Sequence, residues 1–173
     1  MIVTPVEEIA GLYLVDQVYN TELLDQFLAE DLSNIPAKSL PMQERWSTRK
    51  NYRLFPKTSC WQQLQNSVDY APINKMGYHK QRELDTTYWI DLPGFNMGIH
   101  KDVDEVVVSL QVYLGTAEGL GTQFFSEDWR LLLAVPYVKN TGYLLVNKGQ
   151  LHGFPKPVAQ TRHSTYTWLK PNS

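Results

Sequence analysis

The second half of the chain, from about residue 84, is a series of short apolar runs divided by glycine and proline. The runs read TTYWIDL, EVVVSLQVYL, LLLAV, GYLLVN and RHSTYTWL, and they are rich in β-branched and aromatic residues. Such runs, with turn residues between them, favour β-strands. Because many short strands follow one another directly, the architecture that we predict for this half is a double-sheet jelly roll.

Two helices are expected in the first half of the chain. Residues 20–31 carry one apolar stripe at helical spacing, and Asn20 or Thr21 can cap the helix. A second helix is expected to start at Ser59, which stands at capping-box spacing from Gln62. Helices followed by many strands indicate an α+β layout.

We therefore expect a single domain over residues 1–173. Its core would be a double-stranded β-helix, that is, a cupin-like jelly-roll barrel, over residues 84–169. Residues 1–80 would be a support region of helices and loops packed on the outer face of the barrel, and residues 32–58 within it are expected to be loop with at most one short strand.

Composition excludes several classes of protein. The sequence is 43% hydrophobic and 20% charged, with a formal net charge of -2 and no long run of Lys and Arg, so nucleic-acid binding is not favoured. Cys60 is the only cysteine, which excludes an intramolecular disulfide and a cysteine-based zinc site. Glu7 and Glu8 argue against a signal peptide, and no apolar run approaches the roughly 20 residues of a membrane span. We expect a soluble, cytoplasmic protein.

Three residues could together bind a metal ion. His100 and Asp102 are two positions apart, so on a strand or at its end both side chains point to one face. His152 lies 50 positions later, on another predicted strand. Two imidazoles and one carboxylate suit ferrous iron in oxygenases, because they leave positions open for other ligands. His-x-Asp alone is more often a surface turn, and the joint pattern is what favours a metal site.

Arg162 and Ser164 share one face of the last predicted strand. A guanidinium among Thr, Tyr and Trp residues is costly unless it meets an acid, and its planar fork can bind a carboxylate through two hydrogen bonds. The alternative is an exposed ion-pair partner. His163 points to the opposite face and is expected to be structural or exposed, and His79 is expected on a solvated loop.

In the segments GIHKD, LQVYLGTAEGLGTQFF and GYLLVNKGQLHGFPKPVAQTRHSTYTWL the chain resembles the Fe(II)- and 2-oxoglutarate-dependent dioxygenases, particularly their prolyl-hydroxylase-like branch. The resemblance covers roughly residues 84–169. It implies a hydroxylase that uses Fe(II), molecular oxygen and 2-oxoglutarate as co-substrate, and that releases succinate and CO2.

The resemblance also implies a role for individual residues. His100, Asp102 and His152 would be the catalytic iron ligands. Arg162 would bind the distal carboxylate of 2-oxoglutarate with help from Ser164. Tyr88 is a further candidate for contact with the co-substrate, although a core aromatic is an equal alternative. Halogenating relatives replace the ligand carboxylate by a small residue, so the presence of Asp102 favours hydroxylation.

The substrate stays open between a peptide and a small molecule. The strand EVVVSLQVYL is expected to turn Val107, Ser109, Gln111 and Tyr113 toward the cavity and its other residues, from Val106 to Leu114, toward the packed face. A basic and aromatic cluster could grip substrate, but a solvated loop is the favoured interpretation; its members are Arg45, Trp46, Arg49, Lys50 and Tyr52. A non-oxygenase, cupin-like domain that binds metal or sugar, or a structural domain without metal, are the alternatives.

Overall fold

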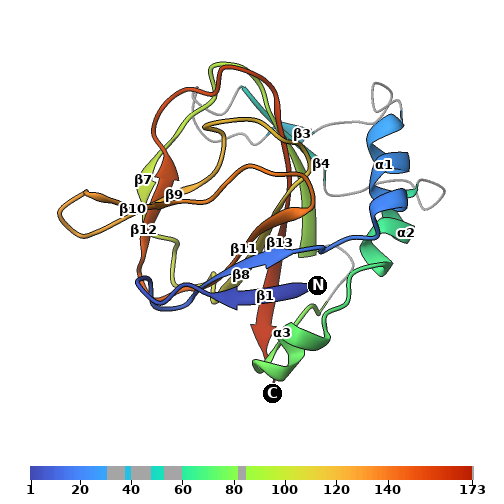
Figure 1. Cartoon of the computed structure of the whole chain (residues 1–173), viewed down its shortest axis with the longest axis horizontal. Helices are drawn as coiled ribbons and strands as arrows, with labels where there is room; N and C mark the ends of the chain where they lie inside the picture. The colour runs from blue at the N-terminus through green and yellow to red at the C-terminus, as the bar shows by residue number, and fades with distance from the viewer. Residues whose placement is uncertain (31–37, 40–47, 53–59, 82–84, 173) are drawn as a thin grey trace.

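The protein is described by a computed structural model covering residues 1–30, 38–39, 48–52, 60–81 and 85–172. Two β-sheets face each other, and the helices lie beyond the larger sheet (Figure 1). All strand ladders in both sheets are antiparallel. The neighbouring strands in each sheet are mostly not consecutive in sequence, which is the arrangement expected of a jelly roll.

The larger sheet has nine strands. In spatial order eight of them are β1 (Ile2–Pro5), β2 (Leu12–Asp16), β11 (Thr141–Val146), β8 (Val108–Tyr113), β13 (Arg162–Pro171), β6 (Thr86–Asp91), β4 (Arg49–Tyr52) and β3 (Lys38–Ser39). The ninth, β5 (Tyr78–His79), pairs with the end of β13. The smaller sheet has the order β10 (Leu131–Ala134), β9 (Gln123–Phe125), β12 (Leu151–Phe154) and β7 (Met97–His100).

The predicted jelly-roll fold is confirmed, with one correction. The described strands form two separate sheets and do not close into a barrel. The prediction of helices and loops for residues 1–80, with at most one short strand in residues 32–58, is wrong, because five strands in this region join the larger sheet. Three of them pair with strands far away in the sequence, β2 with β11, β4 with β6 and β5 with β13, and such pairing leaves no local signal.

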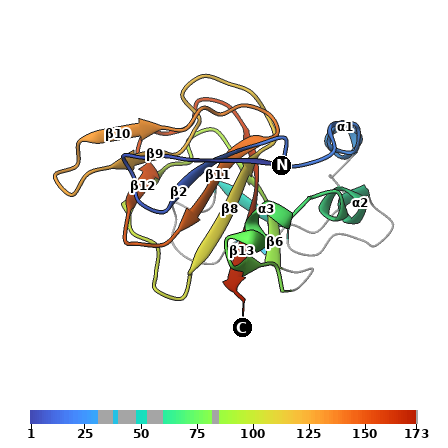
Figure 2. The same cartoon turned by 60° about the horizontal axis from the view of Figure 1, so that its bottom comes forward.

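The helices lie on the outer face of the larger sheet, as predicted (Figure 2). They are α1 (Thr21–Ala29), α2 (Cys60–Asn66) and α3 (Ala71–Lys75). The Asn20 side chain caps α1 by accepting a hydrogen bond from the Leu23 N–H at 3.1 Å. Ser59, the predicted cap of the second helix, lies outside the described residues. The third helix was not predicted; Pro72 lies in its first turn, where a missing N–H costs nothing.

Two apolar layers hold these parts together. One lies between the helices and the larger sheet and includes Leu24, Phe27 and Leu110. The other lies between the two sheets and includes Tyr113 and Phe124. The larger sheet is therefore covered on both faces.

Strand β8 alternates between the two layers. Val108, Leu110 and Val112 pack toward the helices, whereas Gln111 and Tyr113 face the second sheet, as predicted. The prediction is wrong for Val106 and Val107: Val106 lines the cavity described below and Val107 is 40% exposed. The strand begins only at Val108, so the alternation does not extend to the preceding loop.

No helix in the described part of the chain is long and apolar enough to cross a membrane.

Candidate metal centre and its cavity

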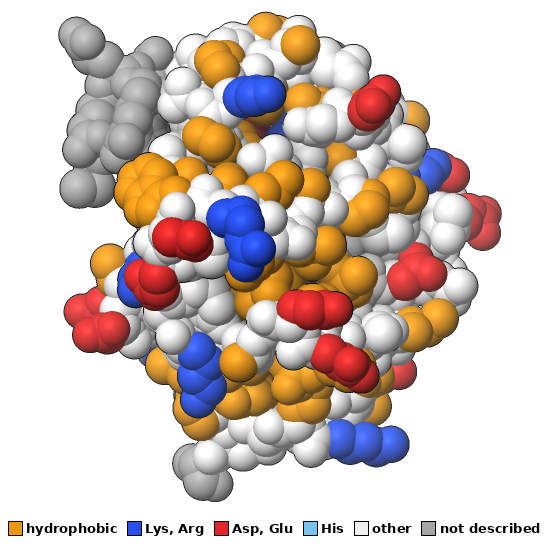
Figure 3. Space-filling view, turned by 60° about the vertical axis from the view of Figure 1, so that its left-hand side comes forward, with side chains coloured by type: hydrophobic (Ala, Val, Ile, Leu, Met, Phe, Trp, Pro, Cys, Tyr) orange, Lys and Arg blue, Asp and Glu red, His pale blue; other side chains and the backbone are white. Residues whose placement is uncertain are grey.

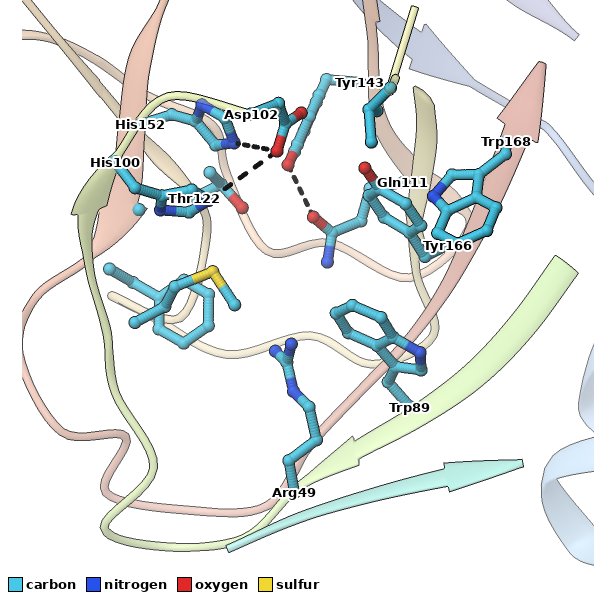
Figure 4. Close-up of a pocket in the computed structure, with 14 residues that line it drawn as sticks. Arg49, Trp89, His100, Asp102, Gln111, Thr122, Tyr143, His152, Tyr166 and Trp168 are labelled. Carbon is cyan, nitrogen blue, oxygen red and sulfur yellow. Dashed lines mark hydrogen bonds and ion pairs between the residues drawn. The ribbon is translucent and has the colours of Figure 1, made fainter. Parts of the chain in front are cut away.

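His100, Asp102 and His152 meet at one edge of the smaller sheet. His100 ends β7 and is the direct cross-strand partner of His152 on β12, with ring centroids 4.6 Å apart. Asp102 follows in the loop, and its Oδ1 lies 3.8 Å from Nε2 of His100 and 3.7 Å from Nε2 of His152. One ligand atom from each residue lies within 4.8 Å of the others (Figure 4). This is the grouping that the sequence predicted.

Backbone carbonyls orient both imidazoles. Nδ1 of His100 lies 2.9 Å from the carbonyl oxygen of Gly98, and Nδ1 of His152 lies 3.1 Å from that of Gln150. A carbonyl only accepts, so each Nδ1 carries the proton and each Nε2 presents its lone pair to the shared space. Burial lowers the pKa of His152, although the Asp102 charge opposes this, and the ring is therefore neutral at pH 7. Two neutral nitrogens and one carboxylate fit a ferrous ion.

A cavity of about 190 Å³ opens beside the three residues and runs between the sheets. Aromatic and apolar side chains form most of its wall; they are Trp89, Met97, Val106, Phe154, Tyr166 and Trp168. Its polar wall residues besides the three candidate ligands are Arg49, Gln111, Thr122 and Tyr143. Figure 4 shows the Arg49 guanidinium pointing into the cavity, across from the His–Asp–His group.

A buried acid joins two buried arginines behind this wall. Asp91, at the end of β6, is fully buried. Its carboxylate accepts from Arg49 Nε at 2.5 Å and Nη2 at 3.0 Å, and from Arg162 Nη1 at 2.7 Å. Burial lowers the pKa of Arg49, an effect that Asp91 opposes. Burial also acts to lower the pKa of Arg162, but Asp91 together with Tyr113 and Tyr143 opposes it, and the pKa is raised. Both guanidiniums are charged at pH 7.

The predicted co-substrate residues Arg162 and Ser164 lie one layer behind the cavity wall. Both are fully buried, and neither lines the cavity. Arg162 Nη2 reaches Thr122 Oγ1 at 3.4 Å. Ser164 Oγ accepts from Gln111 Nε2 at 3.3 Å, while the Tyr143 hydroxyl donates to Gln111 Oε1 at 2.6 Å. Arg162 and Ser164 thus lie next to the site, but other residues form the wall of the cavity.

Tyr88 lies on the other face of the larger sheet. It is 1% exposed, packs against Phe27 and Trp61, and its hydroxyl is 2.5 Å from His163 Nδ1. It does not line the cavity, so the geometry favours the alternative of a core aromatic. His163 points to this same face, opposite to Arg162, as predicted. His79 is on β5 rather than on a loop, and its Nδ1 pairs with Asn172.

Sequence reasoning missed Arg49 as a site residue. Arg49 belonged to the cluster interpreted as a solvated loop, but it lies on strand β4 and is 1% exposed. Tyr52 is buried as well, Lys50 is exposed, and Arg45 and Trp46 lie outside the described residues. Asp91 was overlooked too, although a carboxylate that ends the apolar run TTYWID already indicates a buried ionic partner.

No family model matches the sequence, and no curated protein matches it either. Solved structures do match. HygX from Streptomyces hygroscopicus, with nickel and 2-oxoglutarate bound, is 14% identical; the match covers 93% of this chain and 83% of HygX, with a TM-score of 0.64. A prolyl-4-hydroxylase from Pseudomonas putida is 16% identical over 94% of each chain, with a TM-score of 0.62.

A Trichoplax adhaerens prolyl hydroxylase, in complex with a peptide fragment of the hypoxia-inducible factor, is 12% identical. That match covers 95% of this chain and 85% of the hydroxylase, with a TM-score of 0.63. At such identities the likeness concerns the fold. The chain has the double-stranded β-helix fold of the Fe(II)- and 2-oxoglutarate-dependent oxygenases, and it carries a His–Asp–His group positioned to bind a metal ion.

Proposed function

We propose that this protein is an Fe(II)- and 2-oxoglutarate-dependent dioxygenase that hydroxylates a peptidyl or small-molecule substrate. One atom of O2 enters a substrate C–H bond to give C–OH. The other atom enters succinate, which forms as 2-oxoglutarate loses CO2. The observation that carries the proposal is the convergence of two Nε2 atoms and one carboxylate at the wall of a cavity that also holds a buried guanidinium. A structural domain has no need of such a convergence.

His100, Asp102 and His152 would hold the iron, and iron with bound 2-oxoglutarate supplies the activation of O2 and the oxidation of the C–H bond. The carbonyls of Gly98 and Gln150 fix both imidazoles in the tautomer that a metal ion requires. The largely apolar wall beside these residues strengthens charge interactions at the site. Arg162 and Ser164 support the far end of the co-substrate, as the sequence resemblance implies.

The open cavity and the similar structures support the two proposed types of substrate, a peptide or a small molecule. HygX has been crystallised with hygromycin B, a small molecule, and the Trichoplax enzyme with a peptide. Acidic, basic and hydrophobic side chains are interspersed on the face shown in Figure 3, an arrangement that does not favour a nucleic-acid backbone. We propose a cytoplasmic location on the ground of composition alone.

Anaerobic absorption spectroscopy tests the proposal. Adding Fe(II) and then 2-oxoglutarate to the protein should produce the weak visible charge-transfer band of the mixed chelate, and air should then release succinate. Asp102→Ala should bind Fe(II) at least tenfold more weakly, in line with the loss of one charged ligand, and should show no band. His79→Ala, which changes a histidine outside the site, is the matched control and should behave as wild type.

Metal binding without any response to 2-oxoglutarate would instead identify a cupin-like metal-binding or sugar-binding domain. Absence of metal binding would leave a structural domain.

A further inference from the structure

The two buried arginines, Arg49 and Arg162, have different roles in binding the co-substrate. We infer that Arg49, not Arg162, makes the direct contact with the distal carboxylate of 2-oxoglutarate, and that Asp91 and Arg162 position Arg49. The inference rests on the proposed function and deepens it. It places the contact on β4, outside the part of the chain that resembles the oxygenases in sequence.

The first observation is which cation faces the cavity. Arg49 lines the cavity that His100, Asp102 and His152 border, and its guanidinium points into this space from the opposite side (Figure 4). Arg162 does not line the cavity, and its Nη2 lies 3.4 Å from Oγ1 of Thr122, which does. A linear diacid that chelates a metal at one end directs its other end across the cavity, where Arg49 is the arginine in the wall.

The second observation is how firmly Arg49 is held. Its guanidinium carbon lies 4.0 Å from the ring centroid of Trp89 and 4.1 Å from that of Phe95. Both carboxylate oxygens of Asp91 accept hydrogen bonds from the Arg49 guanidinium. A planar cation fixed between two rings and one acid loses little freedom when a carboxylate binds to it, and burial strengthens the attraction.

The third observation gives Arg162 its role. Its Nη1 donates to Oδ2 of Asp91, the same oxygen that accepts from Arg49 Nη2. Two guanidiniums therefore share one carboxylate in a fully buried place. A ligand carboxylate beside Arg49 brings a second negative charge to this pair and stabilises both cations. Arg162 acts through Asp91 and is a positioning residue.

The experiment compares two ligands that differ only at the distal end. Protein loaded with Mn(II) is titrated calorimetrically with 2-oxoglutarate and with 2-oxopentanoate, in which a methyl group replaces the distal carboxylate. The variants are Arg49→Met and Arg162→Met, which remove the charge at similar length, and Arg49→Lys, which keeps the charge but lacks the planar fork. Thermal unfolding followed by circular dichroism checks that each variant is folded.

Arg49→Met should weaken 2-oxoglutarate binding about tenfold to a hundredfold, the usual effect of losing a hydrogen bond to a charged group. Binding of 2-oxopentanoate should be largely unchanged, so the preference for the diacid collapses. Arg162→Met should keep most of that preference. Arg49→Lys should lose part of the preference for the diacid. If Arg49→Met does not fold, the result for Arg49→Lys tests the inference in its place.

A wild-type preference in the Arg49 variants overturns the inference, and so does an equal collapse in Arg49→Met and Arg162→Met. In both cases wild-type protein still binds 2-oxoglutarate, so the proposed function stands. If Mn(II)-loaded wild-type protein binds neither ligand, the proposed function fails instead.

Discussion

Asp91 is the residue on which the buried charges depend. It accepts three hydrogen bonds from two guanidiniums and is itself fully buried. Asp91→Asn removes the negative charge and leaves two cations facing each other, which should cost about 3–5 kcal/mol of unfolding free energy. Urea denaturation measures this loss. Asp104→Asn changes an exposed carboxylate and should leave the urea midpoint where it is in wild type; equal stability of both variants would contradict the role given to Asp91.

His163 makes stability depend on pH. Burial lowers its pKa, while the more distant Asp91 opposes this, and its Nδ1 is hydrogen-bonded to the Tyr88 hydroxyl. In the unfolded chain histidine titrates near pH 6.5. Between that pH and the lowered folded-state pKa the unfolded chain binds more protons, so the unfolding free energy should fall as the pH falls through this window.

His163→Asn removes this contribution, and its unfolding free energy should fall less steeply below about pH 6.5. The remaining slope includes His152, whose pKa burial also lowers. Urea denaturation at a series of pH values gives the slopes. His79→Asn, which replaces a histidine outside the core that contacts Asn172, is the comparison. Identical slopes in the two variants would show that His163 is not responsible.

At the scale of single residues, the sequence predicted the His–Asp–His group but not the cation that faces it. His100 and Asp102 are two positions apart, a spacing that at a strand end favours one face, although Asp102 itself lies in the loop after β7. Arg49 gave no such signal. The strand RKNY lacks an apolar alternation and is a strand because it pairs with β6, about 40 positions away in sequence. Which of two buried arginines borders a cavity depends on packing between sheets, and local pattern does not record it.

Among the secondary-structure elements, the ladder between β11 and β8 depends on a glycine. A Cβ at Gly142 would lie 1.9 Å from the carbonyl oxygen of Gln111, so the two strands would have to move apart. Gly142→Ala should therefore lower the unfolding free energy by about 1–3 kcal/mol or more. The control is Gly98→Ala, where the added Cβ meets nothing within 4 Å. Urea denaturation of both variants tests this, and a Gly142→Ala protein as stable as the control would refute the close approach.

Element prediction succeeded where the local pattern agreed with the tertiary structure. The apolar stripe of residues 20–31 became α1, and the runs after residue 84 became strands. Strands β1 and β2 were missed, since β1 is largely exposed and β2 exists by pairing with β11. The same reason explains β4. Each of these strands takes its conformation from its partners, and its own sequence carries little information about those partners.

At the scale of the whole molecule, the helices and the candidate metal centre lie on opposite faces of the larger sheet (Figure 1). Phe27 is fully buried between α1 and the sheet, against Trp61 and Tyr88. Phe27→Ala should cost about 3–5 kcal/mol of unfolding free energy. Metal affinity below the unfolding temperature should be unchanged, because the cavity lies beyond the sheet.

Thermal unfolding and Fe(II) titration give the two quantities. Leu132→Ala shortens a side chain on β10 that is 41% exposed, and it should have a small effect on both. A loss of metal affinity in folded Phe27→Ala protein would show that the helices shape the site directly.

That the chain is one domain stays a prediction. It is supported by the larger sheet, which contributes to both apolar layers.

The position of β13 has a consequence for how the protein folds while it is being synthesised. β13 is the last strand in chain order, yet it lies between β8 and β6 near the middle of the larger sheet. During synthesis β8 and β6 therefore leave the ribosome with unpaired hydrogen-bonding edges and uncovered apolar faces. The sheet cannot be completed progressively from one end, and folding has to wait for contacts between distant segments. Nascent chains of this protein should be vulnerable to aggregation until β13 emerges, and chaperones are expected to matter most in that interval.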